Sequence, residues 1–124
     1  MGGGCTSKAA LMFLVLGMAV LPSTLATNYV VGDSAGWNLG VDFVAWVSSK
    51  TFKVQDTLHF EFTSPHTVAV VDQSAYLTCD ASHPIINDVS GSFTFTLTAT
   101  GVYSFISAWD GDCNAGLSMQ LVVA

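Results

Sequence analysis

A regular alternation of apolar and polar residues is the feature of this sequence that most constrains its fold. From Phe93 to Ala99 apolar residues recur at every second position, with threonines between them. A period of two, in stretches bounded by glycine, aspartate and serine, indicates antiparallel strands with one buried face. Several such strands predict a mostly β protein folded as a single Greek-key β-sandwich. The apolar positions of the alternating stretches are Phe52, Val54, Leu58, Phe60, Phe62, Phe93, Phe95, Leu97, Ala99, Tyr103, Phe105, Leu117, Met119 and Leu121.

The segment of residues 41–50 departs from this pattern. Phe43 and Trp46 stand three positions apart there, a spacing that places both side chains on one face of a helix. We therefore expect a short helical segment, with Trp46, like Trp37, in the core. The alternation also loses its phase at Gln55 and Asp56, which predicts a turn.

The beginning of the chain has the pattern of a secretory signal peptide. A polar lead that contains Lys8 precedes an apolar run over residues 9–21, and small residues at Thr24 and Ala26 suit cleavage after Ala26. The alternative is a transmembrane anchor, but the run is short of the roughly 20 residues that cross a bilayer. We expect a signal peptide at residues 1–26, a single domain at residues 27–124, and a secreted product without a membrane span.

The charge of the predicted mature domain is strongly negative. All nine acidic residues follow Ala26 and only Lys50 and Lys53 remain of the basic ones, which gives a net charge of −7. Nucleic acids and anionic lipids are bound through clusters of basic residues, which this chain lacks. We expect no nucleic-acid partner, repulsion from acidic polysaccharides, and a monomer.

Two cysteines remain after the predicted cleavage, because Cys5 leaves with the signal peptide. In an oxidising compartment Cys79 and Cys113 are expected to form one disulfide, and the alternative is two free buried thiols. The disulfide would close a loop of about 35 residues and contribute roughly 3 to 4 kcal/mol in the chain-entropy model. The sequence has no Asn-x-Ser/Thr site for N-glycosylation.

The chain also carries a set of longer motifs. In order they are VGDSAGW (31–37), WVSSKTFKVQDTLHFEF (46–62), PHTVAVV (65–71), YLTC (76–79) and GVYSFISAWDGDCNAGLSMQLVV (101–123). Their order and spacing resemble the plant phytocyanins over nearly all of residues 29–123. The resemblance implies a secreted protein of cupredoxin fold, in which a disulfide joins the cysteine of the YLTC motif to the cysteine of the last loop.

The resemblance also locates the positions that bind copper in phytocyanins, which are a histidine, a cysteine, a second histidine and an axial methionine or glutamine. These positions fall on His66, Ser107, Asp112 and Leu117, so one ligand of four is present. Blue copper needs two imidazoles and a thiolate. We therefore expect a degenerate site without copper or another cofactor, as in the early nodulin-like subgroup, which the chain resembles most. The family also places some members at the outer face of the plasma membrane.

Gln55 is a further departure, since the family usually has glycine at this position. A turn with positive φ would be strained by the Gln55 side chain. We expect a different turn there, without a functional role.

His66 and the acidic residues near the last cysteine allow two interpretations. His66 is either a remaining ligand or polar contact, or a half-buried histidine bonded to a backbone carbonyl. With Asp110 and Asp112 it could bind zinc or calcium, but calcium takes six to eight oxygens and zinc needs a further donor. The simpler interpretation of both aspartates is a solvated loop tip. His59 and His83 are expected to be ordinary surface residues.

Trp109 is the candidate for a binding surface. With Pro65 and Leu117 it could form an exposed apolar patch with an acidic rim, a type of surface that marks interaction sites. The alternative is that Trp109 fills the volume left by the missing ligands. The residues of the predicted surface are His66, Trp109, Asp110, Asp112 and Leu117.

Three classes of function follow from these observations. We favour a copper-free recognition or structural module of the plant cell surface, whose partner is a cell-wall glycan, a proteoglycan or a protein. A carrier of apolar ligands is a variant of this class. The second class is a blue-copper electron carrier, which the family suggests and the missing thiolate opposes. An enzyme is disfavoured, because the sequence contains no catalytic constellation.

Overall fold

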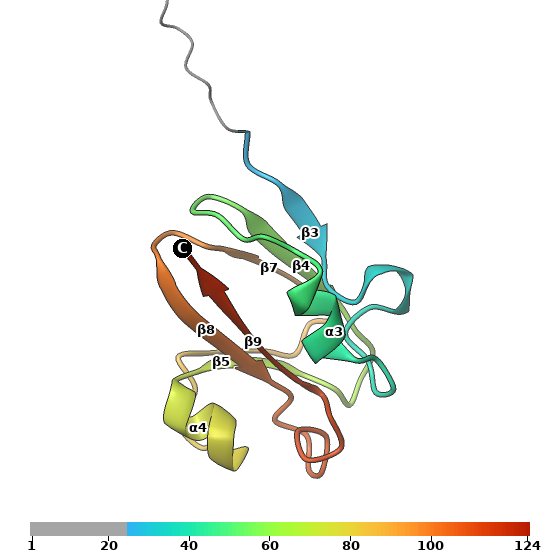
Figure 1. Ribbon diagram of the computed structural model, residues 1–124. Helices are drawn as coiled ribbons and strands as arrows, with labels where there is room; N and C mark the ends of the chain where they lie inside the picture. The colour runs from blue at the N-terminus through green and yellow to red at the C-terminus, as the bar shows by residue number, and fades with distance from the viewer. Residues whose placement is uncertain (1–24) are drawn as a thin grey trace, which may run out of the picture.

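The computed structural model describes residues 25–124 (Figure 1). The predicted signal peptide, apart from Leu25 and Ala26, lies outside the described residues. Among the described helices, none is long and apolar enough to cross a membrane.

Two β-sheets form the body of the protein, as the alternation predicted. The first sheet has the strand order β3 (Asn28–Val30), β4 (Thr57–Glu61) and β7 (Ser92–Thr96). The second has the order β6 (Ile86–Asp88), β5 (Val68–Val71), β8 (Gly101–Ile106) and β9 (Ser118–Val123). β3 runs parallel to β4, and the other neighbours within the sheets are antiparallel. The sheets face one another as two layers (Figure 1), which confirms the predicted sandwich.

The core lies between the layers and is rich in aromatic residues. Phe60 packs with Trp37 on one side and with Phe105 of the opposite sheet on the other, at ring-centroid distances of 5.2 and 5.1 Å. Trp37 and Trp46 are buried, as predicted. Val54 and Ala99 are exposed, contrary to the prediction. They precede β4 and follow β7, respectively, so the alternation does not govern their orientation.

Within residues 25–124, two short α-helices and a 3₁₀ turn, η3 (Asp33–Ala35), accompany the sheets. The predicted helical segment is α3 (Phe43–Ser48), and the carboxylate of Asp42 caps it by accepting a hydrogen bond from Ala45 N at 3.0 Å. The second helix, α4 (Gln73–Thr78), was not predicted. Asp72 caps this helix in the same way, by accepting a hydrogen bond from Ala75 N at 2.8 Å. An aspartate at this position is therefore a sequence signal for the start of α4.

A disulfide joins the end of α4 to the loop of residues 107–117, which we call the ligand loop. Cys79 and Cys113 are linked, with their Cα atoms 5.7 Å apart. The predicted disulfide is confirmed, and the alternative of two free thiols is wrong. As a result, α4 and the ligand loop lie at the same end of the sandwich, the lower end in Figure 1.

The turn before β4 corrects the prediction for Gln55. Gln55 has a φ of 80°, so the turn keeps the positive φ that favours glycine. Hydrogen bonds fix this conformation: Gln55 N donates to Leu97 O at 2.6 Å, and Leu97 N donates to Asp56 O at 2.8 Å. Leu97, which directly follows β7, therefore holds the turn in place, and the side chain of Gln55 is exposed.

Candidate functional site

The four positions that correspond to copper ligands meet at one end of the sandwich. His66 precedes β5, Ser107 follows β8, and Asp112 and Leu117 belong to the ligand loop between β8 and β9. Ser107 N donates to Leu117 O at 3.1 Å, which ties the two ends of the loop together. The sheet order brings these residues together, although His66 and Asp112 are 46 positions apart.

A single carboxylate oxygen connects three of these residues. Asp112 Oδ2 accepts a hydrogen bond from Ser107 Oγ at 2.7 Å and lies 2.7 Å from His66 Nδ1. Ser107 Oγ in turn accepts from Thr67 N at 3.1 Å and from Trp109 N at 3.4 Å. We call His66, Ser107 and Asp112, with these bonds, the polar triad.

The polar triad is shielded from solvent. Ser107 and Asp112 are only 2% and 4% exposed. Gly111 has a φ of 83° and reverses the chain between the exposed Asp110 and the buried Asp112. Buried polar groups must be hydrogen-bonded to be tolerated, and here each satisfies the others. Ser107 and Asp112 thus hydrogen-bond to each other inside the ligand loop, and His66 contacts the same carboxylate from outside the loop.

Two predictions for this region are corrected by these contacts. The partner of His66 is the Asp112 carboxylate, so the interpretation with a backbone carbonyl is wrong. Asp112 is buried, so a solvated loop tip describes Asp110 but not Asp112. This difference could not be predicted from residue types, because both aspartates flank the same glycine.

The predicted surface around Trp109 is also changed. Trp109 is 53% exposed, so the interpretation that it fills an internal volume is wrong. Leu117 is fully buried and contributes nothing to an exposed patch. Of the five residues of the predicted surface, Trp109 and Asp110 are fully at the surface, and His66 is partly accessible.

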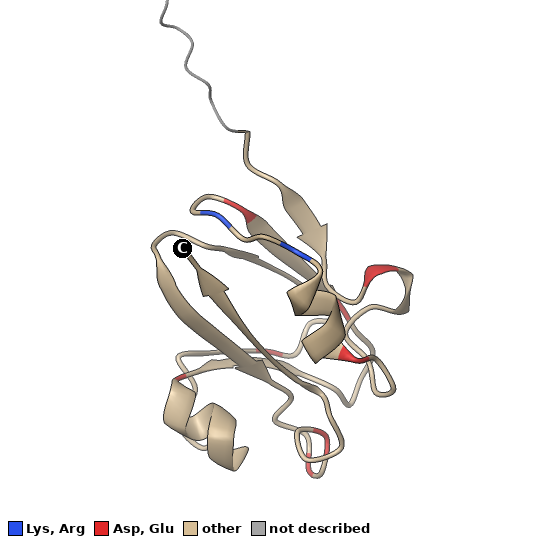
Figure 2. Cartoon of the chain, viewed as in Figure 1, with Lys and Arg blue, Asp and Glu red and all other residues tan. Residues whose placement is uncertain are grey.

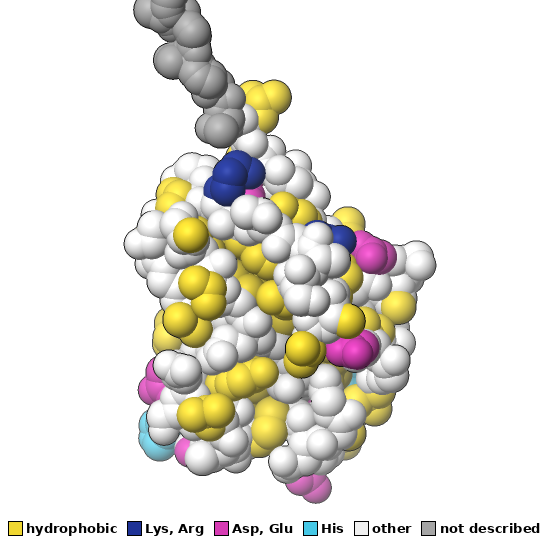
Figure 3. Space-filling model, in the orientation of Figure 1, with side chains coloured by type: hydrophobic (Ala, Val, Ile, Leu, Met, Phe, Trp, Pro, Cys, Tyr) yellow, Lys and Arg dark blue, Asp and Glu magenta, His cyan; other side chains and the backbone are white. Residues whose placement is uncertain are grey.

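A hollow of about 320 Å³ lies beside Trp109. The ligand loop forms one wall, with Trp109 and Asp110, and the chain around the disulfide forms the other, with Ala81 and Ser82. Figure 2 shows that the two lysines of the described residues, Lys50 and Lys53, lie in the upper part of the view, away from this end, while the ligand loop carries acidic residues. Figure 3 shows the same separation on the molecular surface. The hollow therefore combines an exposed indole with negative charge.

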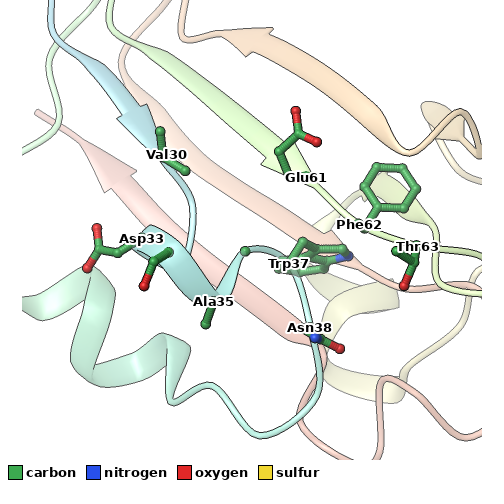
Figure 4. A pocket seen from close by; sticks show the side chains of 10 residues that line it. Val30, Asp33, Ala35, Trp37, Asn38, Glu61, Phe62 and Thr63 are labelled. Carbon is green, nitrogen blue, oxygen red and sulfur yellow. The ribbon is translucent and has the colours of Figure 1, made fainter.

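A second hollow, of about 400 Å³, lies between η3 and the end of β4. Asp33 and Glu61 stand on its sides with Val30 between them, and their carboxylates do not converge (Figure 4). Glu61 bonds to His59 and accepts from Ser92 Oγ at 3.2 Å, and the hydrogen bond with His59 lowers the pKa of Glu61. The side chains that line this hollow therefore do not form a candidate catalytic or metal-binding site. His59, predicted as an ordinary surface residue, is half-buried in this contact, and His83 is exposed.

The sandwich, the disulfide and the group of residues next to the ends of β5, β8 and β9 define a cupredoxin. Residues 37–117 match the family model of the plastocyanin-like domain. The chain belongs to this family and, by its relatives, to the phytocyanins.

Relatives and solved structures agree with this assignment. The chain is 36% identical to uclacyanin-3 of Arabidopsis thaliana, over 98% of this chain and 53% of that protein. It is 34% identical to early nodulin-like protein 5 of the same plant, over 90% of this chain and 62% of that protein. The chain thus spans little more than half the length of these relatives. The structure of cucumber basic protein, a blue copper protein, superposes with a TM-score of 0.72 at 30% identity, covering 79% of this chain and all of that one.

The family implies copper, but the residues present do not fit it. A type 1 site needs a thiolate and two imidazoles. Ser107 supplies a hydroxyl, Asp112 a carboxylate already bonded to His66 and Ser107, and Leu117 no donor atom. Among residues 25–124, no group of three or more histidine, cysteine or acidic side chains is arranged to hold a metal ion. The carboxylate of Asp112 instead contacts the side chains of His66 and Ser107.

Proposed function

We propose that this phytocyanin is a copper-free recognition or structural module of the plant cell surface. The observation that carries the proposal is the polar triad, in which Asp112 Oδ2 binds both Ser107 Oγ and His66 Nδ1. A metal at this end would have to displace the carboxylate from two hydrogen bonds at a buried position, which costs free energy. The donors left to it would be hard oxygens and one imidazole.

Electron transfer is the second candidate, because the family model and the cucumber structure belong to copper proteins. The donor set opposes it, since without a thiolate there is no tuned copper couple. Catalysis finds no support in the triad either. Ser107 Oγ donates to Asp112 and has no hydrogen bond with His66, so the three residues do not form the serine–histidine–carboxylate relay in which an imidazole activates the hydroxyl.

Two features support an extracellular location. The first is the predicted signal peptide at residues 1–26, and the second is the Cys79–Cys113 disulfide, which is typical of oxidising compartments. We propose that the protein is secreted into the cell wall or to the outer face of the plasma membrane.

Trp109 and Asp110 form the proposed recognition surface. Tryptophan is enriched at the centres of interfaces because it offers a large apolar area with few rotatable bonds. The partner is a cell-wall glycan, a proteoglycan or a protein, and the negative charge of this end favours neutral or basic groups on it.

Copper titration tests the copper-free state. The secreted protein is titrated with Cu²⁺, dialysed, and examined by visible absorption and metal analysis, with cucumber basic protein as the positive control. We expect a colourless protein that retains no copper. An intense blue band with stoichiometric copper would overturn the proposal. Copper retained without that band would indicate a different site at His66 and Asp112 and would also overturn it.

Binding to plant cell-wall oligosaccharide and protein fractions tests the recognition surface. We expect Trp109→Ala to abolish binding. Val122→Ala is the matched control, because Val122 is 62% exposed on β9 and lies outside the ligand loop. Equal binding by both variants would exclude the Trp109 surface.

A further inference from the structure

The carboxylate of Asp56 is a buried charge at the other end of the sandwich, near the first described residues. Asp56 is 0% exposed. Its Oδ2 accepts from Lys53 N at 2.8 Å, and its Oδ1 accepts from Thr27 N at 2.8 Å. Lys53 Nζ lies 3.4 Å from the same Oδ1 and is partly exposed. Burial opposes ionisation of Asp56, but the hydrogen bonds from Thr27 and Lys53 outweigh it and lower the pKa of the carboxyl.

Thr27 is also where the fold begins to hold the chain. Thr27 O accepts from Thr57 N at 3.0 Å, and β3 starts at the next residue, with Asn28 opposite Thr57 in β4. Leu25, Ala26 and Thr27 are all exposed, and the hydrogen bonds that tie the chain to β4 and to Asp56 begin at Thr27. These bonds therefore begin directly after the peptide bond between Ala26 and Thr27, the cleavage site that the sequence predicts.

We propose that cleavage after Ala26 creates an α-ammonium group on Thr27 and that the buried Asp56 carboxylate binds it. Hydrolysis by a signal peptidase adds water across the peptide bond, so that Ala26 leaves as a carboxylate and the Thr27 nitrogen becomes a protonated amine. The nitrogen need not move, because it already lies 2.8 Å from Asp56 Oδ1. This inference rests on the secretion that is part of the proposed function.

Cleavage changes the strength of an existing contact. Before cleavage the donor is a neutral amide, and afterwards it is a cation, so that the attraction between two opposite charges is added to the existing hydrogen bond. Lys53 Nζ is the other cation in contact with the carboxylate and shares Oδ1 with Thr27. The new terminus thus stabilises the turn of residues 53–56 and the start of β3 together.

The pH dependence of this contact has a definite sign. A neighbouring carboxylate raises the pKa of the Thr27 amine above the ordinary α-amino value of about 7.7 to 8.0. The stabilisation is then complete below that ordinary value and is lost as the pH rises through the raised pKa. Asp56 stays ionised throughout, because its own pKa is lowered.

The test uses the full chain, expressed with its own leader in secreting plant cells. Intact mass of the secreted product identifies its first residue. A second chain carries Gly-Ser inserted between Ala26 and Thr27, which keeps the Thr27 amide donor and moves the ammonium two residues away. Both forms are also made with Asp56→Asn. Asp33→Asn is the charge-matched control, because Asp33 is exposed and asparagine tolerates its φ of 54°.

We expect a secreted product that begins at Thr27. At pH 6 the insertion should raise the unfolding equilibrium constant about fivefold. The effect should vanish at pH 9.5 and in the Asp56→Asn background, and persist with Asp33→Asn.

A different first residue would overturn the assignment of the terminus. An insertion effect of equal size with and without Asp56 would overturn the ion pair. Neither result changes the copper titration, which tests the proposed function separately, whereas failure to reach the medium would overturn both the secretion and this inference.

Discussion

At the scale of single residues, the interior of the ligand loop depends on one oxygen atom. Asp112 Oδ2 is the acceptor for Ser107 Oγ, and the same oxygen lies 2.7 Å from His66 Nδ1. Ser107 also bonds to the backbone before β5, because its Oγ accepts a hydrogen bond from Thr67 N. The triad consequently links the start of β5 to the end of β8.

Removal of this acceptor should destabilise the fold. We expect Asp112→Ala to lower the free energy of unfolding by about 2 to 3 kcal/mol, since it leaves buried donors without a partner. Asp110→Ala is the matched control, and its effect should stay within about 0.5 kcal/mol because Asp110 is exposed. Urea unfolding at constant m-value measures both. Equal effects of the two substitutions would show that the triad does not hold the loop.

Asp56 predicts a response to acid. Its lowered pKa means that its stabilising contribution is present above the unfolded value of about 3.9 and is lost as the pH falls through the lower, folded value. The difference in unfolding free energy between the wild-type protein and Asp56→Asn should therefore be constant from pH 5 to 6 and shrink below about pH 4. Urea titrations across this range measure it. A difference that grows toward low pH would contradict the direction of the shift.

At the scale of elements, the disulfide makes α4 and the ligand loop one unit. The sequence separation of the two cysteines is 34 residues. The double substitution Cys79→Ala, Cys113→Ala should lower the free energy of unfolding by roughly 3 to 4 kcal/mol in the chain-entropy model. The measurement is urea unfolding of the oxidised wild type against the variant. A reduced wild type should match the variant, and a loss below about 1 kcal/mol would show that packing alone fixes the loop.

The elements also show how far the sequence determines structure. The strands and α3 could be predicted, because alternation and the Phe43–Trp46 spacing are local signals of burial. α4 was missed, since its six residues bury no side chain completely and so leave no apolar face in the sequence. The turn at Gln55 was predicted from the break in the alternation, but its positive φ was not, because that conformation depends on Leu97, which lies 42 positions away in the sequence.

The site shows the same limit. The family resemblance located His66, Ser107, Asp112 and Leu117, and the structure brings them together at one end. Residue types alone did not reveal that Asp112 turns inward and Asp110 outward, because that choice is made by the positive φ of Gly111 between them. The direction of a side chain depends on the folded loop, and the polar triad could be found only there.

At the scale of the whole molecule, the two ends of the sandwich differ in their charged residues. Lys50 and Lys53 lie toward one end, where Lys53 contacts Asp56, and the acidic ligand loop lies at the other (Figure 2). The hydrogen bond from Ser107 N to Leu117 O and the Cys79–Cys113 disulfide hold the ligand loop through contacts that do not involve the Asp112 side chain.

This independence predicts that copper binding can be rebuilt. His66 Nδ1 already faces the centre of the site, Ser107 Oγ lies within hydrogen-bond reach of the same point, and the backbone of Leu117 is fixed by Ser107 N at 3.1 Å. The triple substitution Ser107→Cys, Asp112→His, Leu117→Met supplies a thiolate, a second imidazole and a weak axial thioether. We expect this variant to bind one Cu²⁺ and to turn blue, as measured by visible absorption and electron paramagnetic resonance.

The matched control is the double variant Asp112→His, Leu117→Met, which keeps the Ser107 hydroxyl. It offers two imidazoles without a thiolate, so it should bind copper weakly and show no intense blue band. A folded triple variant that stays colourless would mean that the ligand loop holds its residues in a geometry specific to the Asp112 hydrogen bonds. The polar triad would then define the loop's shape, and the replacement of the copper ligands in this chain would be a change of structure as well as of chemistry.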